Sequence, residues 1–223
     1  MTGNVKVRSG INLLIFCSAC FAIFTDYMGR ELLYSIFKPL TTILVISILF
    51  FGKNSGLIRF KNIMVAALIF CLLGDMLLLQ DKFFVFGLGS FLIAHLLLAY
   101  GFGVLESFQF QWISGILFLG LGLSIFFWLK PDLGNLEIPV AVYILAICFM
   151  AWQGFGLWLK KRILTYALIA IAVFLFMFSD TMIAVNKFKS PFPLSGVVVL
   201  GTYWMSITLI ANAAFLILKG QDT

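Results

Sequence analysis

Residues 63–79 read IMVAALIFCLLGDMLLL, an apolar run that a single carboxylate, Asp75, interrupts. The run has nearly the length of a membrane-spanning helix, which needs roughly 20 apolar residues. Core packing has no use for a carboxylate, and an ionisable group inside a span costs about 3 kcal/mol on insertion scales. The stretch therefore predicts a transmembrane helix, and it marks Asp75 as a candidate functional residue.

The composition of the whole chain indicates the same class of protein. Of its 223 residues, 63% are hydrophobic and 11% are charged, whereas a soluble domain carries about a quarter charged residues. Because backbone groups in lipid must be satisfied within the protein, we expect an all-α, polytopic membrane protein with a single integral membrane domain over residues 1–223. The net charge of +6 does not indicate nucleic-acid binding, because the basic residues lie in short loops between apolar runs.

Eight apolar runs have the length and composition of candidate spans, and most are joined by short turns that carry Lys, Arg, Gly or Pro. The sequence thus predicts a bundle of about eight transmembrane helices. The expected spans are Ile11–Thr25, Tyr34–Phe51, Ile63–Leu79, Phe83–Leu105, Ile113–Leu129, Ile138–Leu159, Ile163–Val185 and Leu194–Leu218.

The basic residues predict the orientation of these spans, because loops rich in Lys and Arg stay in the cytoplasm. Nine of them lie on one side and five on the other, and Lys38, the fifteenth, lies at or just inside the membrane. We expect the side with nine, and with it both termini, to be cytoplasmic, in a bacterial inner (cytoplasmic) membrane. The nine are Lys6, Arg8, Lys53, Arg59, Lys61, Lys160, Lys161, Arg162 and Lys219, and the five are Arg30, Lys82, Lys130, Lys187 and Lys189.

Four ionisable residues lie within the predicted spans, and they are Lys38, Asp75, His95 and Asp180. At a rise of 1.5 Å per residue, Asp75 lies about 18 Å and Asp180 about 26 Å into spans that start on the same side. Gly74 and Ser179, the small residues directly before the two aspartates, would let a neighbouring helix approach closely. If the third and seventh helices pack together, we expect the ionisable groups to meet in one cavity.

Structural roles remain open for the same residues. Asp75 could pair with Lys38 only to hold two helices together, and Asp180 could accept hydrogen bonds from Ser or Thr. His95 could satisfy a backbone carbonyl, and Lys38 could extend its ammonium group to the interface. Two aspartates in matched surroundings nevertheless favour a functional pair.

Four short motifs resemble those of a known family. They are KP at Lys38–Pro39, GDMLL at Gly74–Leu78, FGLGSFLIAH at Phe86–His95 and SDTMIAVNKF at Ser179–Phe188. The motifs occur in the same order and on the same helices as in the YhhN-like family of integral membrane proteins, and the chain resembles that family in this respect. The characterised members of the family are lysoplasmalogenases. The resemblance covers essentially the whole chain.

The resemblance implies a function. It implies hydrolysis of the vinyl ether bond of lysoplasmalogens, which are lysophospholipids of the membrane, to a fatty aldehyde and a glycerophospho-alcohol. It implies Asp75 and Asp180 as the catalytic pair. The residues expected to bind substrate or support the site are Lys38, His95, Ser179, Asn186 and Tyr203. No metal or other cofactor is expected, and the oligomeric state is left open.

Two positions depart from the family pattern. Leu98 stands where a tyrosine often follows the histidine, and no glutamine follows Tyr203 in the last helix. Ser206, Thr208 or Asn212 could supply the missing polar contact. These departures bear on the exact substrate more than on the fold.

The chemistry suits two buried carboxyls. Vinyl ether hydrolysis needs a carboxylic acid that delivers a proton to the alkene carbon, and an anion that stabilises the oxocarbenium ion and orients water. Because a low-dielectric site favours the neutral form of a carboxyl, Asp75, with the more apolar flanks, is interpreted as the acid and Asp180 as the base.

Two other functions are open on the residues alone. A zinc hydrolase would have His95, Asp75 and Asp180 as its three ligands. A proton-coupled transporter would use the two aspartates as its proton relay.

Overall fold

The computed structural model describes residues 2–52 and 55–220, and within them it is all-helical. The predicted all-α class is therefore confirmed. Eight α-helices follow one another, joined by short 3₁₀ turns and loops, and a π-helical turn, η5 (Val185–Lys189), ends the seventh. The helices are α1 (Thr2–Tyr27), α2 (Glu31–Ile48), α3 (Ile58–Leu77), α4 (Phe84–Glu106), α5 (Trp112–Leu133), α6 (Glu137–Lys160), α7 (Leu164–Ala184) and α8 (Ser195–Leu218).

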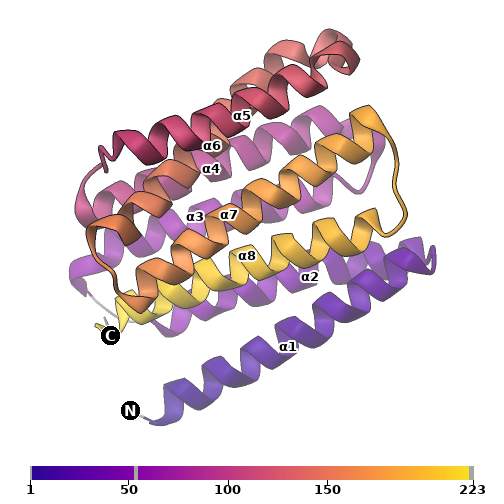
Figure 1. The fold of residues 1–223 in the computed structure, drawn as a ribbon. Helices are drawn as coiled ribbons and strands as arrows, with labels where there is room; N and C mark the ends of the chain where they lie inside the picture. The colour runs from indigo at the N-terminus through magenta and orange to yellow at the C-terminus, as the bar shows by residue number, and fades with distance from the viewer. Residues whose placement is uncertain (1, 53–54, 221–223) are drawn as a thin grey trace.

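Seven continuous helical segments within the described residues are long and apolar enough to cross a membrane. One of them, Trp112–Lys160, has 49 residues and comprises both α5 and α6. The chain reverses between these two helices at Gly134, whose φ of +51° favours glycine, and α5 and α6 then lie side by side (Figure 1). The protein is thus an integral membrane protein, and its eight helices agree with the predicted bundle.

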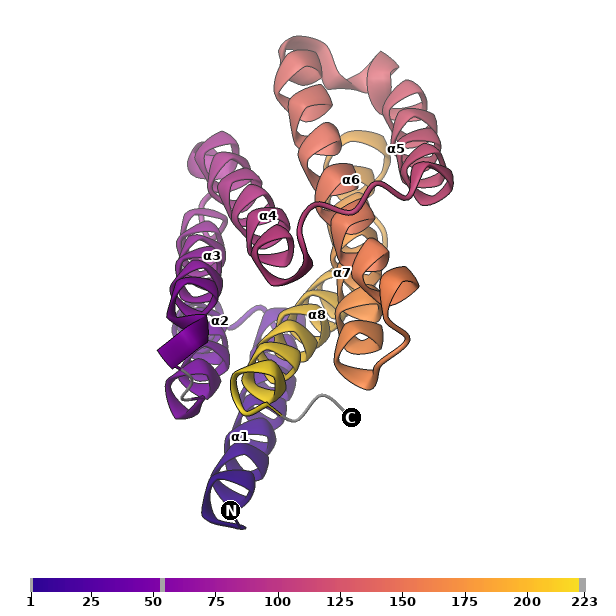
Figure 2. The same ribbon diagram turned by 90° about the vertical axis from the view of Figure 1, so that its left-hand side faces the viewer.

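Six of the helices form a closed ring. Around the ring, each helix packs on the next in the order α2, α3, α4, α6, α7 and α8, and α8 closes the ring by packing on α2. The other two helices lie outside it, α1 against α2 and α8, and α5 against α6 (Figure 2). Polar side chains that point into the ring are therefore enclosed by protein rather than by lipid.

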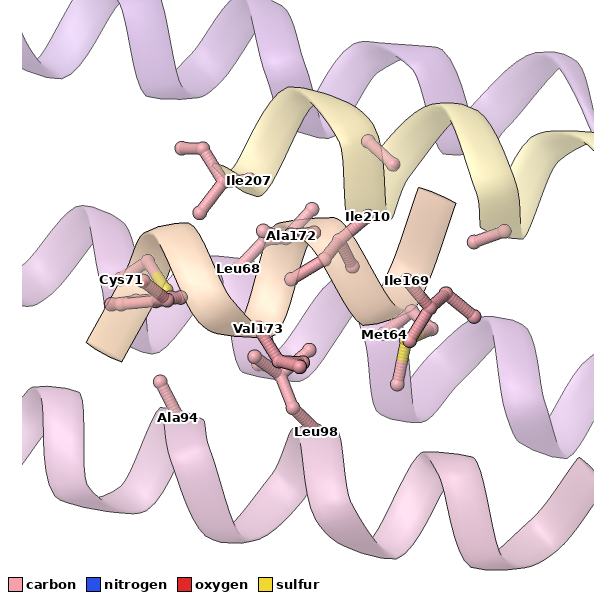
Figure 3. Packing of buried hydrophobic residues seen from close by; sticks show 14 of the residues in the cluster. Met64, Leu68, Cys71, Ala94, Leu98, Ile169, Ala172, Val173, Ile207 and Ile210 are labelled. Atoms are coloured by element: carbon pink, nitrogen blue, oxygen red, sulfur yellow. The ribbon is translucent and has the colours of Figure 1, made fainter. Parts of the chain in front are cut away.

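The third and seventh helices are not the close neighbours that the sequence interpretation assumed. The main neighbours of α3 are α2 and α4, and those of α7 are α6 and α8. Their side chains approach across the interior of the ring instead, where an apolar core fills the space (Figure 3). The labelled core residues are Met64, Leu68, Cys71, Ala94, Leu98, Ile169, Ala172, Val173, Ile207 and Ile210.

Each aspartate continues the apolar stripe that its helix presents to this core. The spacing is four, three and four residues in both helices, which keeps the side chains on one face. The stripes are Met64, Leu68, Cys71 and Asp75 in α3, and Ile169, Val173, Phe176 and Asp180 in α7. The core packing that holds α3 and α7 therefore also directs both carboxyls inward.

The charged residues separate between the two ends of the bundle, as the sequence predicts. At one end Lys187, Lys189 and Lys130 pair with Asp81, Asp132 and Glu137, and at the other Lys160 and Lys161 pair with Glu106. The start of α1 and the end of α8 share the latter end (Figure 1). Lys53 lies outside the described residues. The assignment of this end to the cytoplasm stays a prediction.

Gly74 accounts for one close approach between α3 and α4. A Cβ atom at this position would lie 2.5 Å from Cε2 of the Phe91 ring, which is buried. The absence of a side chain therefore lets the ring of Phe91 rest on α3 directly beside Asp75, as the sequence interpretation of Gly74 anticipated.

We expect Gly74→Ala to destabilise the protein by about 1–3 kcal/mol, because the buried ring of Phe91 would have to move. The measurement is the midpoint of thermal unfolding in detergent. Gly89→Ala is the matched control, since nothing lies within 4 Å of a Cβ atom at that helical glycine. Equal midpoints for the two variants would contradict the packing argument.

Candidate active site

Polar side chains gather inside the ring, and each of the six ring helices contributes at least one. They form two groups, one around Asp75 and one around Asp180. The residues are Thr42 from α2, Asp75 from α3, His95 from α4, Tyr143 from α6, Asp180 from α7 and Tyr203 from α8.

Asp75 is enclosed by hydroxyl donors. Its side chain is 1% exposed, and its Oδ2 accepts hydrogen bonds from the Thr42 hydroxyl at 2.5 Å and the Tyr203 hydroxyl at 2.9 Å. The Thr42 hydroxyl in turn accepts a hydrogen bond from the indole N–H of Trp204 at 3.4 Å. A carboxyl oxygen can accept two hydrogen bonds, so both hydroxyls find an acceptor on this one atom.

Lys38 lies one turn before Thr42 on α2 and is buried rather than extended to the interface. Its ammonium group lies 5.3 Å from the centre of the Tyr34 ring, and it interacts electrostatically with Asp75 and Asp26. No ion pair within 4.0 Å joins Lys38 to any described residue. The direct Asp75–Lys38 pair considered above is therefore not formed, although the two charges share one region.

Asp180 has different partners. Its Oδ2 accepts a hydrogen bond from the Tyr143 hydroxyl and lies 3.5 Å from Nε2 of His95. His95 is fully buried, and neither of its ring nitrogens hydrogen-bonds to a described residue. Its ring packs instead against Phe176 and Tyr143, at centroid distances of 4.6 and 5.3 Å. His95 and Asp180, both predicted site residues, are thus brought together.

Aromatic rings separate the two groups. Phe91 and Phe176 each lie 5.6 Å from the Tyr203 ring and 6.3 Å from each other. Among the described residues, no hydrogen bond joins the two carboxyls, and no three His, Cys, Asp or Glu side chains are grouped to hold a metal ion. The three-ligand zinc site considered above is not assembled in this arrangement.

An apolar cavity adjoins Asp180 but not Asp75. It contains about 670 Å³ of space, part of it open to the surroundings, and is lined mainly by α4, α5, α6 and α7. The polar residues that line it are Tyr143, Asp180 and Thr181; the other walls are apolar. Such a cavity suits an aliphatic chain, and it brings that chain to one carboxyl.

Two other predicted site residues make contacts with the backbone. Ser179 donates a hydrogen bond to the carbonyl of Val199 at 2.9 Å, which ties α7 to α8. Asn186 accepts one from the backbone N–H of Phe192 at 3.2 Å, within the segment that joins these helices. Of the two predicted roles, substrate binding or support, these contacts fit the supporting one, through the position of α7.

Of the three residues that could replace the missing polar contact of the family pattern, two make hydrogen bonds within the bundle. Ser206 donates to the carbonyl of Ala172 at 2.7 Å, and Asn212 exchanges hydrogen bonds with Asn12 at 3.0 Å. Leu98 is part of the apolar core. The Thr208 hydroxyl is buried and has no hydrogen-bond partner among the described residues.

Sequence reasoning missed Thr42 and Tyr143. Thr42 follows Lys38 by four residues, so the two share one face of α2. Tyr143 lies within a span and not at the interface, where tyrosines are enriched. A hydroxyl inside a span needs a hydrogen-bond partner. Helical spacing and depth could have identified both as candidates.

Comparisons with known proteins give a consistent result. A model of the YhhN family matches residues 33–214. Bovine lysoplasmalogenase TMEM86A is 33% identical over 153 residues, which are 66% of this chain and 62% of the bovine one. Human lysoplasmalogenase TMEM86B is 26% identical over 202 residues, which are 90% of this chain and 84% of that protein. The chain thus spans less than two thirds of TMEM86A, and no solved structure matches.

We expect Tyr203→Phe to destabilise the protein by about 1 kcal/mol, because it removes one of two donors to Asp75 and keeps the ring. Thermal unfolding in detergent measures the loss. Tyr27→Phe, at a position that is 66% exposed, is the control and should unfold like the wild type. A Tyr203→Phe variant of wild-type stability would show that the bond contributes nothing.

Proposed function

The chain belongs to the YhhN family, and from this premise we propose that it is a lysoplasmalogenase-like hydrolase. Its substrate is a lysoplasmalogen, and the bond cleaved is the vinyl ether. One observation carries the proposal: Asp180 lines a cavity whose other walls are almost entirely apolar, as the binding of an aliphatic chain requires. The name lysoplasmalogenase, which the relatives carry, supports it.

The cavity and the carboxyl suit an amphiphile whose reactive bond adjoins its chain. The vinyl ether lies between the hydrocarbon tail and the glycerol, so a tail in the cavity would carry the bond to Asp180. An apolar environment favours the neutral carboxyl, which is the form that the first step needs. No metal is required for this chemistry.

The reaction begins with a proton from the Asp180 carboxyl. The proton adds to the alkene carbon farther from the ether oxygen, and the π electrons form the new C–H bond. The adjacent carbon becomes an oxocarbenium ion, which the Asp180 carboxylate now stabilises. Water adds to this carbon and gives a proton back to the carboxylate. The resulting hemiacetal breaks its bond to the glycerol oxygen, which takes the hydroxyl proton, and the fatty aldehyde is released.

The cavity favours Asp180 as the acid, whereas the sequence interpretation assigned that role to Asp75. Asp180 lines the cavity, and its carboxyl accepts one hydrogen bond from the described residues, whereas that of Asp75 accepts two. Asp75 is enclosed by Thr42 and Tyr203 and lies behind the ring of Phe91. Asp75, together with Lys38, is proposed to act as a positioning residue whose charge supports the site without touching the substrate.

His95 and Tyr143 complete the proposed site. Tyr143 donates to Oδ2 of Asp180 and so orients the carboxyl. His95 has both nitrogens available and lies 3.5 Å from the same oxygen, so it is suited to hold the attacking water beside the carboxylate. A buried imidazole without partners is costly, and a bound water would satisfy it.

The location of the reaction follows from the predicted orientation. The cavity's outer end is lined by Phe84 and Phe188, at the end of the bundle that holds Lys187 and Lys189. With both termini in the cytoplasm, this end faces away from the cytoplasm. The inner membrane and this orientation stay predictions.

We expect Asp180→Asn to lower aldehyde release from a vinyl-ether lysolipid by about 10²–10⁴-fold, the usual contribution of a general acid. We expect Asp75→Asn to lower kcat by about tenfold or more with little change in KM, because the proposed role of Asp75 does not involve contact with the substrate. Purified protein in detergent, assayed for aldehyde, gives both values.

Glu31→Gln, at an exposed position outside the site, is the control for these carboxyl variants and should match the wild type. Absence of aldehyde from a folded wild-type preparation would reject the proposed function. Full activity of Asp180→Asn would remove this residue from the mechanism.

We expect His95→Phe to lower kcat by roughly 100-fold while the protein stays folded, because phenylalanine keeps the ring contacts and loses both nitrogens. His95→Gln should recover part of the rate, since its amide can hold water. A second measurement adds methanol to the assay. Methanol competes with water for the oxocarbenium ion and gives a mixed acetal instead of the aldehyde. A higher ratio of acetal to aldehyde in His95→Phe supports the role in holding water. An unchanged ratio together with an unchanged rate contradicts it.

A further inference from the structure

The outer end of the apolar cavity carries a ring of charges that the mechanism does not use. Two aromatic residues line the cavity there, Phe84 and Phe188, whose rings meet edge to face at 6.0 Å. The ammonium group of Lys187 lies 5.2 Å from the centre of the Phe84 ring. A cation is thus placed directly against the wall of the cavity.

Three ion pairs lie at the same end of the bundle as Phe84 and Phe188. Lys187 pairs with Asp81 at 2.8 Å, Lys130 pairs with Glu137 at 3.0 Å, and Lys189 pairs with Asp132. Each pair joins two different segments: α5, α6 and η5 also line the cavity, and η3, which holds Asp81, directly precedes α4, another wall. We call these six residues the charge ring.

Stability alone gives a weak reason for the charge ring. Five of its six side chains are between 42% and 93% exposed, and Lys189 is 23% exposed. Exposed pairs between flexible side chains contribute little to folding. Side chains of both signs at the mouth of an apolar cavity are better explained by a ligand that carries both signs.

The π-helical turn η5 connects the charge ring to the cavity. Phe188, within this turn, lines the cavity, while its neighbours Lys187 and Lys189 reach the carboxylates. The backbone N–H of Phe192 donates a hydrogen bond to the amide oxygen of Asn186, which helps to hold the turn. Single π-helical turns frequently mark functional sites.

We propose that the charge ring is a binding site for a zwitterionic phospholipid headgroup. Lys187 and Lys189 receive the phosphate, and Asp81 and Asp132 receive the ammonium group of an ethanolamine. The inference rests on the proposed function, because it takes the lipid in the cavity to be the substrate. Lysine binds phosphate as a compact charge, and bonds between charged partners are the strong ones.

The distances agree with this arrangement. Asp180 and Lys187 are seven residues apart along α7 and η5, which corresponds to about 10 Å. The vinyl carbon that takes the proton and the phosphorus atom are separated by seven bonds. An extended chain of that length spans about 8 Å, at roughly 3.5 Å for every three bonds. A phosphate at Lys187 would therefore leave the vinyl ether beside Asp180.

The test compares two substrates that differ only in the headgroup. One is 1-alkenyl-glycerophosphoethanolamine, and the other is the 1-alkenylglycerol without phosphate. The double variant Lys187→Gln, Lys189→Gln should lose roughly 10- to 100-fold in kcat/KM on the first, the equivalent of one or two charged hydrogen bonds. It should keep the wild-type value on the second.

The matched control is Lys160→Gln with Lys161→Gln, at the opposite end of the bundle. These two lysines also form ion pairs, both with Glu106, so the control loses the same number of charges. It should hydrolyse both substrates like the wild type. Equal use of the two substrates by the wild type would overturn the headgroup site, and so would an equal loss on both substrates in the Lys187/Lys189 variant.

A binding measurement separates this inference from the proposed function. The saturated ether analogue, 1-alkyl-glycerophosphoethanolamine, has no vinyl bond to cleave. It should raise the unfolding temperature of the wild type more than 1-alkylglycerol does, and the Lys187/Lys189 variant should lose the difference. If this difference appears without any hydrolysis of the vinyl ethers, the proposed reaction fails and the headgroup site stands. If it does not appear, the headgroup site fails.

Discussion

Two carboxyl groups inside an apolar bundle are the constraint on which the rest of this structure depends. Each must find hydrogen-bond donors, because lipid and apolar side chains supply none. The six ring helices meet this requirement, with Thr42 and Tyr203 serving Asp75, and Tyr143 and His95 lying at Asp180. The closed ring of helices is therefore needed chemically as well as for packing, since each carboxyl draws partners from helices far apart in sequence.

The two carboxyls become unequal because aromatic rings divide the interior. The rings of Phe91 and Phe176 stand between the two groups, and Gly74 lets Phe91 pack directly against α3. Asp75 is left with hydroxyl donors and a distant cation, while Asp180 lines a cavity. Environments that differ in this way are how proteins give two similar acids separate roles.

The sequence predicted the helices and singled out the two aspartates, because long apolar runs identify spans and a carboxylate within one stands out. The inward face of each aspartate also follows a pattern present in the sequence, since apolar spacing of four, three and four residues determines which side of a helix is buried. The sequence did not predict that α3 and α7 face each other across the ring, or that Thr42 and Tyr143 complete the site. Which helices become neighbours depends on how all eight pack, and this is not encoded in the spacing of any one helix. The assignment of the acid depended on the same information. The apolar flanks of Asp75 describe only α3, whereas the cavity beside Asp180 is formed mainly by α7 together with α4, α5 and α6.

The cost of burial and the proposed chemistry have one physical origin. A low dielectric makes an ionised carboxyl expensive, and for the same reason it keeps a proton on a carboxyl that lacks enough donors. Additional donors at Asp180 would stabilise its ionised form, whereas the proposed first step needs the neutral acid. Asp180 has one donor hydroxyl, from Tyr143, and lies 3.5 Å from a histidine whose nitrogens make no hydrogen bond to a described residue. It therefore has fewer donors than Asp75, which has two. Such an incompletely satisfied polar group is expected where a site gives up stability for reactivity.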